Sequence, residues 1–152
     1  MSLLDMLKKV DMFKGLSIQE INKIGALCKE KSFGEGEIII EEDKIGEALY
    51  IIKSGSARVV KMEGGEEKKL AEVSEGEHIG EMSLMDDMTT SARVVAQQST
   101  ECLVLYKEDL ELLLNTDDKL HIKILRAMIR TLTLRLRRTS EDLMLWKMEF
   151  TE

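Results

Sequence analysis

The segment 80–84, with the sequence Gly-Glu-Met-Ser-Leu, combines residue types that suit contact with a phosphate group. The pattern predicts one short helical turn between two strands, and the first turn of a helix offers unpaired backbone N–H groups to an anion. The glycine before the turn lets the backbone approach a ligand closely. The Glu81 carboxylate then either accepts a hydrogen bond from a ribose hydroxyl or, as a structural residue, accepts from backbone N–H groups of the same segment, and the sequence leaves both roles open.

No other group of residues predicts catalysis or metal binding. His78 and His121 have no cysteine or carboxylate at metal-ligand spacing. The acidic pairs 41–42 and 86–87 lack a neighbouring nucleophile or electrophile, so we interpret them as solvated loop charges. The chain has neither a G-x-S-x-G motif nor a Walker loop. We therefore expect a binding protein without a metal, not an enzyme.

Length and composition set the class of protein. A chain of 152 residues predicts one domain over 1–152, and its 43% hydrophobic and 34% charged residues are typical of a globular protein. A net charge of −7 argues against bulk affinity for nucleic acid or anionic lipid. No apolar run is long enough to span a membrane, and the N-terminus does not resemble a signal peptide. Cys28 and Cys102 are too few for a disulfide framework, so we expect buried thiols in the cytoplasm.

The elements that position the segment 80–84 follow from periodicity. A helical pattern over 3–10 precedes a capping box, Ser17 with Glu20, which predicts a helix start. Short strand-like runs separated by glycine turns then recur about every 10 residues, as in an all-β sandwich or barrel. These runs are 38–40, 48–52, 57–60, 70–73, 92–97 and 102–106.

The C-terminal part predicts one long helix with an apolar seam. The seam repeats at 4-3 spacing, as in a coiled coil, with a single polar member. Its residues are Leu125, Ile129, Leu132, Leu136, Thr139, Leu143, Trp146 and Phe150. A helix of this length exceeds the width of a small barrel, so we expect a homodimer through the seam, with packing on its own barrel as the alternative.

The same helix is basic. Residues 118–138 carry a net charge of +6, so the rest of the chain carries −13. We interpret the basic residues as a solvated helix face. Pairing with the acidic barrel and docking of an acidic partner protein stay open as alternatives. No helix-turn-helix follows the long helix, so we expect no direct DNA binding.

The segment 76–95 resembles the phosphate-binding cassette of the cyclic nucleotide-binding domain family, which includes catabolite activators, protein kinase A regulatory subunits and gated channels. The family pattern is Gly-Glu-apolar-small-Leu, a loop, then Arg-(Ser/Thr/Ala)-Ala-x-Val. Residues 13–17 resemble the family's helical start, 33–39 its first strand, and 47–55 its next strand and glycine turn. The resemblance implies a mainly β fold, an eight-stranded jelly roll (double-stranded β-helix) with flanking helices. We expect N-terminal helices over 1–33, the β-roll over 34–107 and C-terminal helices over 108–152.

The cassette departs from the family pattern at one decisive position. Thr90 stands where the family has its phosphate-binding arginine. Arg93 is a candidate substitute cation, although its odd offset of three residues points it to the opposite face of a strand. Asp86 and Asp87 add negative charge to the loop. A second departure is Glu42, where the family usually has glycine. By resemblance, the ligand contacts come from Gly80, Glu81, Met82, Ser83, Thr90 and Ser91.

Two functions remain open at this point. The first is a non-enzymatic sensor domain with weak or absent binding of cAMP or cGMP. Binding is weak because the arginine is missing, and an arginine–phosphate pair contributes ~1.5–3 kcal/mol, or roughly 10- to 150-fold in affinity. The second is a degenerate domain that serves as a dimerisation or protein-docking module without a nucleotide. In the first case the pocket lies between residues 80–91 and the start of the C-terminal helix.

Overall fold

The computed structural model describes residues 1–150, apart from the side chains of Trp146, Glu149 and Phe150. Within this range eight strands form two antiparallel sheets of four, which confirms the mainly β roll with flanking helices. One sheet has the order β1 (Lys29–Phe33), β8 (Thr100–Tyr106), β3 (Ala48–Ser54) and β6 (His78–Ile79). The other has the order β2 (Ile38–Ile40), β7 (Arg93–Ala96), β4 (Ser56–Glu63) and β5 (Glu66–Ser74).

Helices flank the roll at both ends of the chain. Those before it are α1 (Leu3–Lys8), η1 (Asp11–Phe13) and α2 (Ile18–Gly25); η2 (Glu81–Leu84) lies within it, and α3 (Lys107–Thr116) and α4 (Asp118–Phe150) follow. The predicted capping box starts α2: the Ser17 hydroxyl accepts from the Glu20 N–H at 3.2 Å, and the Glu20 carboxylate accepts from the Ser17 N–H at 2.9 Å.

The first strand differs from the sequence prediction. We expected it over 33–39, but the chain turns at 34–37, where Gly36 adopts a φ of 84° that favours glycine. β1 therefore ends at Phe33 and β2 begins at Ile38. β1 also begins at Lys29, inside the stretch 1–33 that the sequence assigns to helices. The sequence does not reveal this strand because it lacks the alternation of buried and exposed residues: only Phe33 is buried.

Two clusters of buried side chains form the core. One joins the helices to the first sheet and includes Leu7, Phe13, Leu49 and Leu120. The other lies between the two sheets and includes Phe33, Ile52, Val94 and Cys102. Both cysteines are free thiols, with Cys102 buried and Cys28 partly buried. Burial raises the pKa of each thiol to about 11.

The helix α4 has two apolar faces, and only one packs on the roll. Leu120, Ile124, Ala127 and Met128 are buried. The described apolar members of the predicted seam are exposed, from 41% at Leu125 to 68% at Leu136. Trp146 and Phe150 belong to the seam, but their side chains lie outside the described part of the structure.

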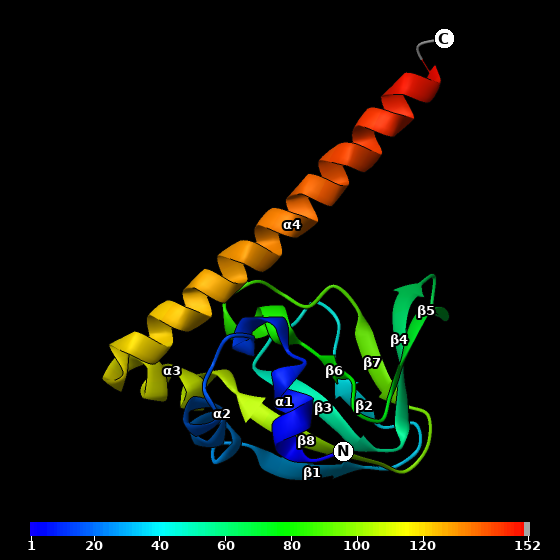
Figure 1. Cartoon of the computed structure of the whole chain (residues 1–152). Helices are drawn as coiled ribbons and strands as arrows, with labels where there is room; N and C mark the ends of the chain where they lie inside the picture. The colour runs from blue at the N-terminus through cyan, green and yellow to red at the C-terminus, as the bar shows by residue number, and fades with distance from the viewer. Residues whose placement is uncertain (151–152) are drawn as a thin grey trace.

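At 33 residues α4 is about 50 Å long, and its C-terminal half extends well beyond the roll (Figure 1). Among the described helices none is long and apolar enough to cross a membrane.

Candidate functional site

A cavity of about 460 Å³ lies between the segment 80–91, the neighbouring strands and α4. We call it the cassette cavity. All six predicted cassette residues line it, namely Gly80, Glu81, Met82, Ser83, Thr90 and Ser91. Ile40, Val59, Ile79 and Val94 give it an apolar wall, and His78, Asp86 and Arg135 add polar groups. An apolar wall with a few polar groups at one side is typical of a small-molecule site.

Gly80 sets the geometry of the cassette. The segment after it forms the predicted helical turn, as the 3₁₀ helix η2. Gly80 adopts a φ of 87°, and a Cβ at this position would lie 2.6 Å from the Ala48 carbonyl oxygen of β3. A larger residue would therefore strain the backbone and push η2 away from the sheet.

The Glu81 carboxylate is buried and connects two parts of the chain that lie far apart in sequence. One oxygen accepts a hydrogen bond from the Met12 N–H of η1 at 3.0 Å. The other lies 3.6 Å from the His78 Nε2. Glu81 thus has a structural role, one of the two that the sequence leaves open. Its backbone partner, however, belongs to the N-terminal helices and not to the cassette.

Thr90 holds the loop 41–44 against the cassette. Its hydroxyl donates to the Glu41 carbonyl oxygen and accepts from the Lys44 N–H at 3.4 Å. Its backbone N–H donates to the Lys44 carbonyl oxygen at 2.8 Å, and its carbonyl oxygen accepts from the Asp43 N–H at 3.0 Å. Thr90 therefore lines the cavity with a hydroxyl that already has protein partners.

Arg93 does not line the cassette cavity, so the structure does not bring this candidate substitute cation to the cassette. Its guanidinium donates to the Glu41 carboxylate at 2.8 Å and is not among the groups that line the cassette cavity. The alternation of side chains along β7 explains this placement: Val94 lines the cavity, so its neighbour Arg93 is directed to the other face of the strand. The pairing with Arg93 holds the pKa of Glu41 below its ordinary value.

The acidic loop residues have basic partners. Lys61 lies 2.5 Å from the Glu42 carboxylate and lowers its pKa. Lys107 lies 2.5 Å from the Asp87 carboxylate, which lowers the pKa of Asp87, and it also donates to the Asp86 carbonyl oxygen at 2.5 Å. The Glu42 side chain is only 10% exposed, so its interpretation as a solvated charge is wrong, whereas the Asp87 side chain is 94% exposed and remains a solvated loop charge despite its pair with Lys107. Only Asp86 of the loop pair lines the cavity.

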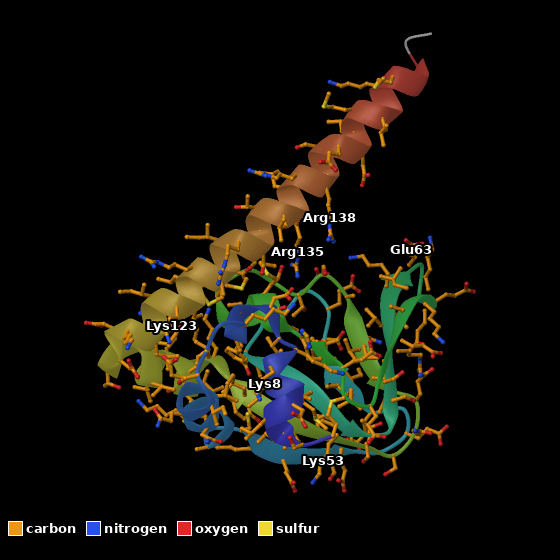
Figure 2. The ribbon with its side chains drawn as sticks, viewed as in Figure 1. Lys8, Lys53, Glu63, Lys123, Arg135 and Arg138 are labelled. Carbon is orange, nitrogen blue, oxygen red and sulfur yellow. The ribbon has the colours of Figure 1, made fainter. Side chains whose placement is uncertain are left out.

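Arg135 is the site residue that sequence reasoning missed. It reaches the cassette cavity from α4, with Nη1 3.9 Å from the Met82 Sδ and Nη2 3.5 Å from the Asp11 carboxylate of η1. Figure 2 shows Arg135 on the side of α4 that faces the roll. A signal was present in the sequence: Arg135 follows Ile124 and Met128 on one helical face, at spacings of four and seven residues.

No group of three or more His, Cys, Asp or Glu residues in the described part of the chain could hold a metal ion. The site consists of backbone groups, hydroxyls, two carboxylates, one imidazole and one guanidinium around an apolar wall. Such a set can bind and orient a polar ligand, and it includes no nucleophile paired with a base.

Known proteins resemble this chain in sequence and in fold. The "Cyclic AMP receptor protein" of Thermus thermophilus is 36% identical over 104 residues, 68% of this chain and 48% of that protein. The N-terminal domain of a transcriptional regulator from Streptomyces coelicolor superimposes with a TM-score of 0.78 and 29% identity, covering 91% of this chain and 94% of that one. This chain spans about half the length of the first relative and less of the others.

Two structures of protein kinase A regulatory subunits are also similar to this chain. The regulatory subunit of a cAMP-independent protein kinase A from Trypanosoma cruzi, bound to guanosine, has a TM-score of 0.63 and 31% identity, covering 74% of this chain and 40% of that one. The corresponding Trypanosoma brucei subunit is bound to cAMP as a variant with three substitutions, one of which is Thr→Arg. Its TM-score is 0.65 at 27% identity, and the match covers 86% of this chain and 46% of that one.

A family model described as "Cyclic nucleotide-binding domain" matches residues 30–117, more than half of the chain and all of the cassette. The chain belongs to the cyclic nucleotide-binding domain family.

Proposed function

We propose that this protein is a non-enzymatic regulatory domain whose cassette cavity takes a purine cyclic nucleotide weakly. The observation that carries the proposal is the cavity that the cassette residues line. By resemblance to the family pattern, Thr90 stands where a phosphate-binding arginine is expected. Loss of one charge-assisted pair lowers affinity roughly 10- to 150-fold. We expect dissociation constants in the tens of micromolar or weaker. Two buried or partly buried free thiols fit a cytoplasmic location.

The charge around the cavity supports weak binding of anions. Glu81 and Asp86 line it with carboxylates, and Arg135 is the one Lys or Arg side chain among the described residues that line it. A cyclic nucleotide adds one negative charge near these carboxylates, whereas a nucleoside adds none. Guanosine, the ligand of the Trypanosoma cruzi structure, is therefore a useful neutral comparison for cGMP.

Calorimetric titration with cAMP, cGMP and guanosine tests the proposal. We expect measurable but weak heats for at least one cyclic nucleotide. Sub-micromolar affinity for cAMP or cGMP would contradict the argument from Thr90. The pair cGMP and guanosine shares its base and 2′-hydroxyl, so a difference between them reports on the cyclic phosphate, which replaces the 3′- and 5′-hydroxyls of guanosine.

The second candidate is a dimerisation or protein-docking module without a nucleotide ligand. The observation that favours it is the exposed seam on α4, in which Leu125, Ile129, Leu132, Leu136 and Leu143 are all at least 41% exposed. Apolar residues at heptad spacing pair readily with a second helix. We propose a homodimer through this seam in both cases. A titration in which neither cyclic nucleotide nor guanosine binds at millimolar concentration would favour the module without a ligand.

A further inference from the structure

We infer that Arg135 of α4 supplies the positive charge for an anionic ligand in the cassette cavity, in place of the arginine that Thr90 replaces. The inference rests on the proposed function, because it assumes that the cavity takes a nucleotide. It assigns the charge to the C-terminal helix and not to the cassette. Binding of an anion would then join the roll directly to α4.

Arg135 lies between two cavities. It lines the cassette cavity and also a second cavity of about 480 Å³ between η1 and α4, which Asp11, Lys14, Arg130 and Arg138 line as well. One guanidinium nitrogen lies near the Met82 sulfur of the cassette, and the other lies near the Asp11 carboxylate. A small rotation of the side chain would therefore move its charge from Asp11 into the cassette cavity.

The contact with Asp11 is weak enough to exchange for a ligand. Its distance of 3.5 Å is long for an ion pair, and the Arg135 side chain is 51% exposed. Asp11 has a closer partner, the Lys14 ammonium at 2.8 Å, so the carboxylate keeps a counter-charge when Arg135 turns away. Exposed pairs of this kind contribute little to stability. A guanidinium can moreover bind two phosphate oxygens with parallel N–H groups.

The other nearby cations are poorly placed for this role. Lys61 pairs with Glu42, Arg93 pairs with Glu41, and neither is among the groups that line the cassette cavity. Arg138 lies one helical turn beyond Arg135, also on the roll side of α4 (Figure 2), but it lines only the second cavity. Arg138 is therefore a matched control: the same residue type on the same helix, lining the same second cavity as Asp11 but not the cassette cavity.

The test compares cGMP with guanosine in four versions of the full chain. In Arg135→Gln, we expect cGMP affinity to fall about five- to tenfold, since the lost pair is partly exposed, and guanosine affinity to stay within twofold. In Asp11→Asn, we expect cGMP affinity to rise about two- to threefold, because the competing carboxylate is gone. In Arg138→Gln, we expect both affinities to stay within twofold of the natural chain.

Four other outcomes distinguish failure of the inference, failure of the proposed function and support for the inference. Unchanged cGMP binding in Arg135→Gln would show that Arg135 does not meet the phosphate, and the proposed function would stand. Equal losses for cGMP and guanosine would show that Arg135 only holds the structure. If neither ligand binds the natural chain or Asp11→Asn, the proposed function fails and the inference fails with it. If cGMP binds Asp11→Asn alone, Arg135 is the cation and Asp11 is its competitor.

Discussion

Replacing Thr90 with arginine should restore much of the affinity for cyclic nucleotides. Thr90 lines the cassette cavity and lies half-buried beside Ser91, so a longer side chain at this position can reach the space that the cassette encloses. A charge-assisted pair with phosphate contributes ~1.5–3 kcal/mol, which corresponds to roughly 10- to 150-fold. Because Glu81 and Asp86 also line the cavity, they would compete for the new guanidinium. We therefore expect a gain near the lower limit, about tenfold for cGMP.

The substitution also has a cost to stability that must be measured separately. Thr→Arg removes the two hydrogen bonds that the Thr90 hydroxyl makes with Glu41 and Lys44. At ~1 kcal/mol for each bond, urea unfolding should show a loss of about 1–2 kcal/mol. Thr90→Gln removes the same two bonds without adding charge and is the matched control. The Trypanosoma brucei variant bound to cAMP shows that a family member can combine Thr→Arg with cyclic nucleotide binding.

Calorimetry on the folded variants decides the result. Thr90→Arg should bind cGMP about tenfold more tightly and guanosine as before, whereas Thr90→Gln should change neither. Adding Asp86→Ser should raise cGMP affinity further, most clearly at low salt. Adding Asp87→Gly should not, because Asp87 points to Lys107 and is not among the groups that line the cavity. If Thr90→Arg folds normally and gains no affinity for cGMP, the cavity does not receive a phosphate and the docking-module function is favoured.

Three further predictions concern assembly, the cassette and the thiols. Truncation after Arg138 shortens the apolar seam, so it should shift the protein towards monomer in sedimentation experiments. A full-length chain that is monomeric at high micromolar concentration would refute the homodimer. Glu81→Ala leaves the Met12 N–H without its acceptor, so it should lower the free energy of unfolding, measured in urea, by about 1–3 kcal/mol. Glu81→Gln keeps an acceptor oxygen and should lower the free energy of unfolding by less. Since burial raises the pKa of Cys28 and Cys102 to about 11, both should react slowly with a disulfide reagent at pH 8 and fast in urea; rapid reaction of the folded chain would contradict their burial.

The sequence predicts the fold well where local patterns decide the structure. The capping box at Ser17 and the glycine turn before Glu81 both form as expected. Contacts across long sequence distances could not be predicted in the same way. The bond between Glu81 and the Met12 N–H spans 69 residues, and no local pattern indicates it.

The rotation of α4 about its own axis could not be predicted from the sequence either. The helix carries two apolar stripes, one through Leu125 and Ile129 and one through Ile124 and Met128. Periodicity marks both as apolar but does not say which one packs on the roll. The structure buries the second stripe, and this choice brings Arg135 to the cassette cavity. As long as the buried stripe is unknown, Arg135 cannot be distinguished from the other basic residues of the helix.

The length of α4 has a mechanical consequence. Met128 is the last buried residue of this helix in the described part of the chain, and 22 residues follow it up to Phe150. At 1.5 Å per residue, this portion of the helix extends about 33 Å from its last buried residue. A tilt of the helix by about 10° at Met128 would displace the far end by about 6 Å. A side-chain rearrangement of ångström size near Arg135 would thus be amplified into a movement that a partner helix can detect.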